Sequence, residues 1–375
     1  MSFKAKPKKK LMFVILSLSG GGAERVMLHI INHLDMDKYD IRLVTFEDVR
    51  DYQKELSPAV KQIYLNKKSR WDFFKLVFQL RKTIMDYQPD TIISFDYYVN
   101  IIAILARSLT GRSFKLIISE RNYPEKNLSE ERLRWLKKWL MKTTYRKADI
   151  ILSVSNSIKD ALEKDFKVQP GKTRTVYNPI VVEDITLKSK EEISHPFFRY
   201  SSDQVVISSG RLVRQKRFDR LLEAFSIVRK KMGNVYLIIL GKGDLLEELR
   251  NKASKLAVSA YVDFVGFKSN PYAWISKADL FVLSSDFEGF PNVLSEAMAC
   301  GTPVVSTDCL SGPREIITNG KDGMLVPPGD ESALAEAMYR LLASDELREK
   351  FSREGKKRVE DFRIDKIVKQ YEQFF

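Results

Sequence analysis

Short, continuous apolar segments alternate with helix-like stretches along this chain, and this alternation constrains the fold more than any other feature. The first instance is an apolar segment over residues 11–16, a glycine-rich turn, a helical pattern over 23–34 and a second apolar segment over 41–46. Strands that are apolar on both faces belong to parallel sheets that helices cover on both sides. The alternation therefore predicts strand–helix–strand units in an α/β fold.

The alternation forms two series, separated by a polar stretch between Pro179 and Gln204 that has little apolar periodicity. The first series continues through residues 91–94, 115–119 and 150–154, and the second contains residues 205–207, 235–240, 262–265, 280–283, 302–306 and 324–326. A chain of 375 residues also exceeds what one core usually organises, at roughly 150 residues per domain. We predict an N-terminal Rossmann-like domain over 1–180, a linker over 181–203, a C-terminal Rossmann-like domain over 204–362 and a helix over 363–375 that returns to the N-terminal domain.

The charge of the chain favours phosphate-bearing partners. Lysine and arginine number 63 against 49 aspartate and glutamate residues, a net charge of +14. This excess suits nucleotides, nucleic acid or anionic lipid headgroups without choosing among them. The two cysteines, Cys300 and Cys309, and the three histidines have no metal-ligand spacing, so we expect no metal site and a reducing compartment.

The first apolar segment superficially imitates a secretory signal, because it follows three lysines. It ends in a serine–glycine turn and the charged pair Glu24 and Arg25, without a small-residue cleavage site, so a buried strand is the better interpretation. No stretch of the sequence approaches the roughly 20 apolar residues of a membrane-spanning helix. We expect a cytoplasmic protein.

The most informative motif spans residues 286–305, directly after the predicted strand 280–283. A helix is predicted from Pro291 or Asn292 to the stop at Cys300 and Gly301. A glycine-containing turn before a helix start offers backbone N–H groups and the positive end of the helix dipole to an anion such as a sugar diphosphate. Glu288 and Glu296 can hold hydroxyl groups through charge-assisted hydrogen bonds. The alternative is an ordinary strand, turn and helix with two surface glutamates.

A second motif follows the first strand of the C-terminal series, over residues 208–219. Arg211 and Lys216 can neutralise a diphosphate leaving group, which a metal ion does in other enzymes. The alternative is a solvated basic loop.

Both motifs resemble those of the family-4 retaining glycosyltransferases. Glu288 and Glu296 match the E-x7-E pattern, flanked by Gly-Phe-Pro-Asn-Val and Gly-Thr-Pro-Val-Val, and the Gly-Arg-Leu sequence with a lysine five residues after the arginine resembles the family's diphosphate-binding element. The resemblance covers nearly the whole chain and implies the GT-B fold, two Rossmann-like domains facing across a cleft. It implies that the first domain binds the acceptor and that the second holds most of the nucleotide-sugar donor.

The resemblance also implies roles for individual residues. Glu288, Arg211 and Lys216 would act in catalysis, with Glu288 holding the donor sugar and Glu296 the ribose. The nucleotide-sugar donor, with UDP favoured, would bind to Gly210, Arg211, Lys216, Gly289, Phe290, Pro291, Asn292, Val293 and Glu296. No cofactor or metal is implied.

In the predicted N-terminal domain, Gly21 and Gly22 lie in the turn after the first strand, where glycines let a backbone approach a phosphate or sugar. The turn does not match G-x-G-x-x-G, because Arg25 occupies the last position, so a dehydrogenase is disfavoured even though Glu47 imitates a ribose-binding acid. Gly-Gly-Ala-Glu-Arg here resembles bacterial family-4 enzymes that build lipid-linked or surface polysaccharides, and we include Gly21 and Gly22 in the donor site.

Glu120 and Arg121 follow another N-terminal strand, at the sheet edge where open α/β sheets bind ligands. Many family members carry a histidine about here, whereas this chain has Arg121, so a histidine-assisted step is not implied. We predict Glu120 as a catalytic general base, with shaping of the acceptor site or a buried structural ion pair as alternatives.

A helix is predicted between Arg132 and Lys147, with Leu133, Leu136 and Leu140 packing inward. Another face gathers tryptophans with basic residues: Trp135, Lys138, Trp139, Lys142 and Arg146. This mixture suits an anionic bilayer surface, and the alternative is that the tryptophans pack on a neighbouring loop. In the stretch 71–81, we expect Phe74, Val77 and Leu80 to lie mostly in the core.

We therefore predict a hexosyltransferase-type retaining enzyme, peripheral on the inner face of the cytoplasmic membrane. It would move a sugar from a nucleotide-sugar donor to a polyprenyl-diphosphate-linked acceptor. A donor-binding but inactive relative is one alternative. A nucleic-acid-binding protein that stacks bases is the other, but it explains neither motif, so we expect no nucleic-acid partner.

Overall fold

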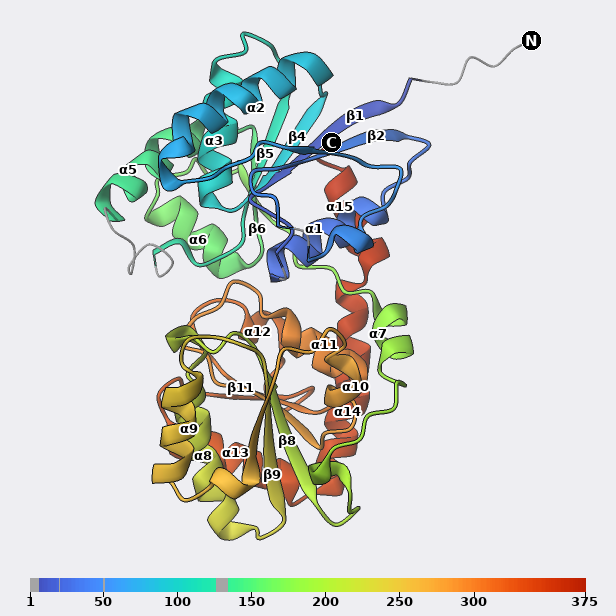
Figure 1. Cartoon of the computed structure of the whole chain (residues 1–375), viewed down its shortest axis with the longest axis vertical. Helices are drawn as coiled ribbons and strands as arrows, with labels where there is room; N and C mark the ends of the chain where they lie inside the picture. Colours follow the sequence, from blue (N-terminus) through green and yellow to red (C-terminus); the bar gives the residue numbers. More distant parts are fainter. Residues whose placement is uncertain (1–6, 20, 50, 126–133) are drawn as a thin grey trace, which may run out of the picture. The chain divides into compact units, whose positions relative to one another are not determined.

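The computed structural model of the chain describes residues 7–19, 21–49, 51–125 and 134–375. It contains two α/β units, each with a parallel sheet, as Figure 1 shows. The first unit comprises Met1–Pro179 together with Ile364–Phe375, and the second comprises Ile180–Arg363. The predicted class, two Rossmann-like α/β domains, is confirmed.

The first unit is built on a seven-stranded sheet in the order β3-β2-β1-β4-β5-β6-β7, in which all pairs are parallel. Its strands are β1 (Lys9–Ile15), β2 (Tyr39–Thr45), β3 (Lys61–Tyr64), β4 (Thr91–Phe95), β5 (Lys115–Glu120), β6 (Ile150–Ser153) and β7 (Thr173–Thr175). Its helices are α1 (Gly22–Asn32), α2 (Phe73–Tyr87), α3 (Tyr97–Ser108), α5 (Arg134–Thr144), α6 (Asn156–Lys164) and α15 (Ile364–Glu372). The sequence predicted the five apolar strands but not β3 and β7, because these are short and only partly buried.

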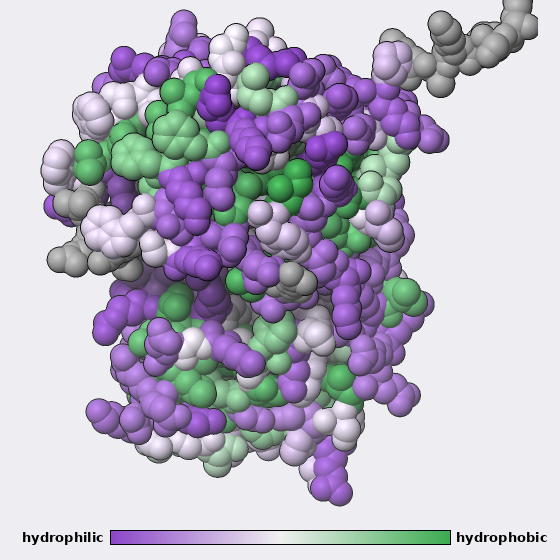
Figure 2. All heavy atoms as spheres, turned by 45° about the horizontal axis from the view of Figure 1, so that its top comes forward, coloured by the Kyte–Doolittle hydropathy of each residue, from purple (hydrophilic) through white to green (hydrophobic). Residues whose placement is uncertain are grey.

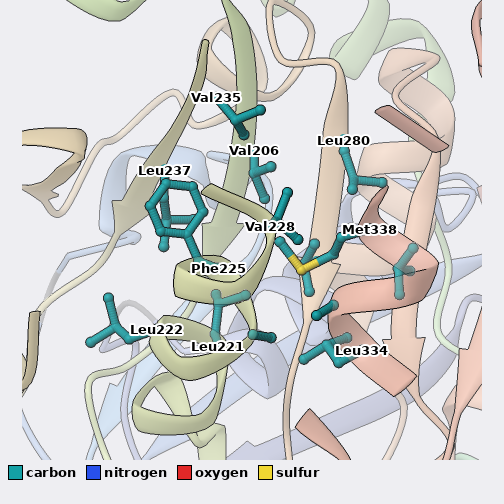
Figure 3. Packing of buried hydrophobic residues seen from close by; sticks show 14 of the residues in the cluster. Val206, Leu221, Leu222, Phe225, Val228, Val235, Leu237, Leu280, Leu334 and Met338 are labelled. Atoms are coloured by element: carbon teal, nitrogen blue, oxygen red, sulfur yellow. The ribbon is translucent and has the colours of Figure 1, made fainter. Parts of the chain in front are cut away.

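The second unit contains a six-stranded parallel sheet in the order β10-β9-β8-β11-β12-β13. Its strands are β8 (Gln204–Ser209), β9 (Val235–Leu240), β10 (Val262–Gly266), β11 (Leu280–Leu283), β12 (Val304–Thr307) and β13 (Met324–Val326). Its helices are α7 (Val182–Lys188), α8 (Phe218–Lys231), α9 (Leu246–Lys255), α10 (Tyr272–Ile275), α11 (Asn292–Cys300), α12 (Pro313–Ile316), α13 (Glu331–Leu342) and α14 (Asp345–Val359). In Figure 3, Val206 and Leu237 of the sheet pack against Phe225 of α8 and Met338 of α13, all fully buried.

The strand order reverses once in each sheet. In the first sheet, β2 and β3 lie on one side of β1, and β4 to β7 lie on the other; in the second, β9 and β10 lie on one side of β8, and β11 to β13 lie on the other. Loops that leave neighbouring strands in opposite directions open a crevice at the carboxyl ends, and open α/β sheets bind ligands there. The two reversal points, β1/β4 and β8/β11, are therefore where each unit can hold a ligand.

Residues 181–203 and α15, which lie outside the alternation of strands and helices, each belong to one of the two units. Residues 181–203, expected to be a linker, contain α7 and belong to the second unit, where α7 contacts α11. A helix with Ile185 as its one buried side chain is too short to produce a detectable period. At the other end of the chain, α15 belongs to the first unit, where the ring of Phe375 lies 5.7 Å from that of Tyr39. Over the described ranges, the helices are all too short or too polar to cross a membrane.

Candidate functional site

The loops that follow β8 and β11 are joined at the reversal point of the second sheet. The backbone N–H of Asp286 donates to the carbonyl of Gln215 at 2.9 Å, and the Gln215 side-chain amide donates to the carbonyl of Phe287 at 2.8 Å. The hydroxyl of Ser284 donates to the carbonyl of Lys216 at 2.8 Å. The two sequence motifs, although far apart in the chain, therefore form one site.

Lys216 and Glu288 meet at the centre of this site. The Lys216 Nζ lies 2.6 Å from Glu288 Oε1, and the hydroxyl of Ser285 donates to the same oxygen at 2.6 Å. Both charged side chains are largely withdrawn from water. Burial of an isolated charge is costly, so each partner is stabilised mainly by the other, and loss of either leaves an unpaired buried charge.

The other basic side chains after β8 differ in whether a carboxylate pairs with them. Arg217 pairs with Asp219 and with Asp286, which also accepts from Arg220. Arg211 is exposed, and no carboxylate among the described residues pairs with its guanidinium. Arg211 is therefore available to an anionic ligand, whereas Arg217 holds the two loops together.

Helix α11 begins at Asn292 and ends at Cys300, with Gly301 in the left-handed region at φ 85°, as the sequence predicted. The turn before it, residues 289–291, is fixed by the hydroxyl of Ser311, which donates to the carbonyl of Gly289 at 3.0 Å. Gly312 approaches this turn so closely that a Cβ there would lie 2.5 Å from Pro291 Cδ. The start of α11, with Val293 in its first turn, is therefore held rigidly beside the Lys216–Glu288 pair.

Phe290 and Glu296 lie deeper than the sequence indicated. The Phe290 ring is buried and stands 5.4 Å from that of Phe362. Glu296 is buried on α11, with the hydroxyl of Tyr272 at 3.5 Å from its Oε1. The proposed ribose contact of Glu296 stays a prediction.

Gly241 and Gly243, which follow β9, belong to the site, and sequence reasoning missed them. A Cβ at Gly241, whose φ is 140°, would overlap the carbonyl oxygen of Gly210, and one at Gly243 would overlap the backbone of Leu212. The N–H of Leu212 donates to the carbonyl of Lys242 at 2.9 Å. The Gly-Lys-Gly sequence directly after a strand could have indicated these residues. Only glycine at 241 and 243 lets the loop after β9 pack so closely on the loop after β8.

The predicted donor-site glycines of the N-terminal series lie in the first unit. Gly21 is the residue that precedes α1, and Gly22 begins the helix. Glu24 folds back over this turn, where its Oε1 accepts from the hydroxyl of Ser19 at 3.1 Å. Their contact with a donor stays a prediction, and Gly20 of the same motif lies outside the described residues.

Glu120 ends β5 and is buried. Its Oε2 accepts a hydrogen bond from the hydroxyl of Tyr145 at 2.6 Å, and burial raises the pKa of the Glu120 carboxyl to about 8. The amide of Asn100 donates to the same tyrosine hydroxyl at 3.3 Å. A carboxyl with this pKa exchanges its proton near neutral pH, which a general base requires, but the role itself stays a prediction.

Arg121 is buried and contacts residues of the first unit's interior. Its guanidinium is buried, lies 4.5 Å from the centre of the Phe95 ring, and donates to Asn178 Oδ1 at 2.5 Å. It therefore connects β5 with the last residues of the first unit before Pro179.

On α5, the two tryptophans are exposed, at 67% for Trp135 and 56% for Trp139, while Met141 packs inward. Arg146 is exposed and Lys142 is half-buried. Lys138 pairs with Glu125 and lies 5.4 Å from the centre of the Phe166 ring. Of the leucines expected to pack inward, Leu136 and Leu140 are only half-buried, because Met141 and Thr144 form the buried side of α5, and Leu133 lies outside the described residues.

Helix α2 corrects one expectation. Val77 and Leu80 are buried, as predicted, but Phe74 is 72% exposed, together with Trp71 at 81% and Phe78 at 61%. The buried stripe contains Leu76, Val77, Leu80 and Ile84, and Phe74 and Phe78 lie on another side of the helix because four residues return to the same face. Figure 2 shows apolar surface among hydrophilic atoms on the first unit.

The described residues contain no group of three or more histidine, cysteine and acidic side chains that is arranged to hold a metal ion. The Asp35–Met36–Asp37 triplet forms a turn, in which Asp35 Oδ1 accepts from the N–H of Asp37 at 2.9 Å.

Two family models match the chain in sequence. Residues 20–184 match the model described as Glycosyltransferase Family 4, and residues 189–358 match the model described as Glycosyl transferases group 1.

Among curated proteins, two from Campylobacter jejuni are similar over their whole length. One is named N-acetylgalactosamine-N,N'-diacetylbacillosaminyl-diphospho-undecaprenol 4-alpha-N-acetylgalactosaminyltransferase; it is 32% identical over 96% of this chain and 98% of that protein. The other is named GalNAc-alpha-(1->4)-GalNAc-alpha-(1->3)-diNAcBac-PP-undecaprenol alpha-1,4-N-acetyl-D-galactosaminyltransferase; it is 29% identical over 96% of this chain and 97% of that protein. Among solved structures, the Anabaena protein HepE in complex with UDP superposes with a TM-score of 0.81 at 19% identity, covering 97% of this chain and 98% of that one.

Proposed function

Because this chain belongs to glycosyltransferase family 4, whose members are GT-B enzymes that transfer glycosyl groups, we propose that it moves a sugar from a UDP-sugar to a polyprenyl-diphosphate-linked acceptor with retention at the anomeric carbon. The observation that carries the proposal is the Lys216–Glu288 pair beside the open Arg211 at the reversal point of the second sheet. This arrangement gives a diphosphate two cations and gives a sugar hydroxyl a fixed carboxylate.

In the proposed donor complex, Arg211 and Lys216 face the diphosphate, and the backbone at Gly210 and around the start of α11 approaches its oxygens. Glu288 holds a hydroxyl of the donor sugar and Glu296 holds the ribose. A ligand phosphate would compete with Glu288 for Lys216, so donor binding would redistribute the hydrogen bonds of this pair. UDP is favoured over GDP because HepE, the structural neighbour above, was solved with UDP.

The transfer step requires no covalent intermediate on the protein. The acceptor hydroxyl oxygen forms a bond to the anomeric carbon on the face that the diphosphate leaves, while the bond from that carbon to the diphosphate oxygen breaks. The electron pair departs with the diphosphate, whose growing negative charge Arg211 and Lys216 stabilise. The hydroxyl proton passes to the departing diphosphate oxygen, or to Glu120 if this residue acts as the predicted base.

The acceptor class is supported by the two Campylobacter proteins, whose names describe undecaprenyl-diphosphate-linked substrates. A lipid-linked substrate lies in a membrane, so the enzyme must work at a membrane surface. We assign this surface to Trp135, Trp139 and Lys142 of α5 with Arg146 of the turn that follows it, and extend it to the exposed aromatic residues of α2 in the same unit. Aromatic rings beside basic groups suit the headgroup region of an anionic inner leaflet.

The proposal is tested with a panel of nucleotide sugars and polyprenyl-diphosphate-linked acceptors, beginning with UDP-N-acetylhexosamines. Arg211→Ala should lower kcat/KM by about 10²–10³-fold, the usual loss when one group that stabilises transition-state charge is removed. Glu288→Ala should lower it at least as much, because it removes the contact to the sugar hydroxyl and the partner of Lys216 together. The matched control is the exposed pair Lys231 and Glu336, 3.2 Å apart in the same unit. Lys231→Met with Glu336→Gln should leave transfer unchanged. Full activity in both site variants would refute the site assignment.

A further inference from the structure

The Lys216–Glu288 pair must separate when the proposed donor binds. Lys216 Nζ lies 2.6 Å from Glu288 Oε1, yet the same ammonium is one of the two cations assigned to the diphosphate. A diphosphate carries more negative charge than one carboxylate, so it draws Lys216 away from Glu288. A largely buried carboxylate that loses its cation is destabilised. Glu288 therefore needs a second contact that keeps it in place in the donor complex.

The hydroxyl of Ser285 is this second contact. It donates to Glu288 Oε1 at 2.6 Å, the length of a strong hydrogen bond from a hydroxyl to a charged carboxylate. Ser285 is fully buried, three residues before the glutamate in the chain. A ligand phosphate that attracts Lys216 leaves this hydrogen bond intact, because the serine hydroxyl is neutral and is not accessible from solvent.

Both contacts of the Glu288 carboxylate fall on the same oxygen. Lys216 and Ser285 bind Oε1, and no residue in the described part of the chain donates a hydrogen bond to Oε2. The carboxylate therefore has one anchored oxygen and one that a sugar hydroxyl can use. The last torsion of a glutamate side chain is soft, and its rotation would move Oε2 away from the sugar. Once Lys216 has turned to the diphosphate, Ser285 is the contact that opposes this rotation.

The backbone holds both ends of this hydrogen bond in fixed positions. Ser285 is the second residue after β11, and its carbonyl accepts from the hydroxyl of Thr307, the last residue of β12, at 2.7 Å. The N–H of Glu288 donates to the carbonyl of Leu310 at 3.1 Å. The ends of two parallel strands therefore set where the serine hydroxyl meets the carboxylate.

Other buried hydroxyls around Ser285 have a different kind of partner. Those of Ser208, Ser284 and Thr307 each donate to a backbone carbonyl, at distances between 2.6 and 2.8 Å. Backbone groups and water are the usual partners of a side-chain hydroxyl. Ser285 instead donates to the carboxylate of Glu288, which indicates a role in the site in addition to packing.

We propose that Ser285 is a positioning residue for sugar transfer. Its hydroxyl holds Glu288 Oε1 while Lys216 moves from Glu288 to the diphosphate, so that Oε2 stays directed at the hydroxyl of the donor sugar. The inference rests on the proposed function, which assigns Glu288 to the sugar and Lys216 to the diphosphate. Because Ser285 is fully buried, it acts through Glu288 and does not touch the ligand.

A double-mutant cycle with Glu288 separates this role from a structural one. Ser285→Ala should lower kcat/KM for the nucleotide sugar about tenfold, the order of effect of one hydrogen bond to a charged group. It should also weaken the affinity for UDP roughly threefold to tenfold, because the diphosphate then leaves Glu288 without a partner when it takes Lys216. In the Glu288→Ala background, the same substitution should change neither quantity by more than about twofold. A purely structural serine would have the same effect in both backgrounds.

Ser226→Ala is the matched control. Ser226 is a buried residue of α8 in the same unit, and its hydroxyl donates to the carbonyl of Glu223 at 2.8 Å. This variant also loses one buried hydroxyl, so its melting temperature reports the cost of that loss alone. Its affinity for UDP and its kcat/KM should equal those of the wild type.

Calorimetric titration of the full chain with UDP requires neither sugar nor acceptor, so it distinguishes failure of this inference from failure of the proposed function. If Ser285→Ala binds UDP as the wild type does, or if it weakens binding equally in both backgrounds, the inference fails, whatever the transfer assays show. If the two substitutions couple as expected but no sugar is transferred, the role of Ser285 stands and the proposed function fails. If neither UDP nor GDP binds, both fail, because each places a diphosphate at Lys216.

Discussion

The same topology carries opposite chemistry in the two units. At the reversal point of the second sheet, a buried carboxylate, Glu288, is paired with an ammonium, and Arg211 stays open to solvent. At the reversal point of the first sheet, the Glu120 carboxyl accepts from a tyrosine hydroxyl, and Asp96 Oδ1 has no hydrogen-bond partner among the described residues. The parallel sheet therefore fixes where each unit can hold a ligand, and a few loop residues set the charge of that position.

Glu120 gives the largest expected difference between the two units. Its protonation should make the stability of the first unit depend on pH. Its pKa is about 8 in the folded protein against 4.5 for an ordinary glutamate, so the folded state holds a proton that the unfolded chain releases. The free energy of unfolding should then fall as the pH rises from about 4.5 through 8, by at most roughly 5 kcal/mol. Glu120→Gln should abolish this fall and exceed the wild type in stability above pH 8, while the two converge at acid pH.

The measurement is the melting temperature of the full chain between pH 4 and 9, with Glu125→Gln as the control because Glu125 is exposed and ion-paired. An identical pH profile in the wild type and Glu120→Gln would show that the two units do not differ in the way described.

The rigidity of the donor loops is tested at Gly241. Gly241→Ala forces the loop that carries Arg211 to move, because the new Cβ overlaps the carbonyl of Gly210 and the φ of 140° is unfavourable for alanine. We expect a loss of about 1–3 kcal/mol in stability and at least a tenfold weaker affinity for UDP. Gly233→Ala is the matched control, since nothing lies within 4 Å of its new Cβ. Thermal unfolding measures the loss of stability, and calorimetric titration with UDP measures the affinity. Unchanged affinity in Gly241→Ala would mean that this loop does not bind the donor.

The smallest expected effect concerns the exposed aromatic residues, which we assign to membrane contact in the first unit only. Replacing Trp135 and Trp139 together by serine, or Phe74 and Phe78 together, should weaken partition onto anionic liposomes by roughly threefold to tenfold. Leu187→Ser is the control, because Leu187 is 70% exposed on α7 in the second unit. Flotation assays report the bound fraction. If Leu187→Ser weakened liposome binding as much as the double variants, membrane contact would not be specific to the first unit. If neither double variant changed liposome binding, the proposed membrane surface would be refuted.

Local patterns in the sequence were sufficient for much of the fold. The apolar segments predicted most strands, with β9, β11 and β13 matching residue for residue, because a parallel strand buried on both faces must be apolar along its length. The bounds of α11 followed from Pro291 and Gly301, since proline and glycine act on their own backbone. The two motifs that we propose for donor binding could also be singled out from sequence, because helix starts and basic loops are local features.

Only the tertiary structure decided which of these residues meet. Lys216 and Glu288 are 72 residues apart in the chain, and no local pattern encodes their pairing. Phe74 was predicted to be buried because it is apolar, but it is exposed in the structure. Burial depends on which side of the helix packs against the unit and not on hydrophobicity alone. Asp96 directly follows β4, and its Oδ1 is buried without a hydrogen-bond partner among the described residues, which no local sequence pattern indicates. Secondary structure is set largely by neighbours along the chain, whereas charge pairing, burial and cavities are set by neighbours in space.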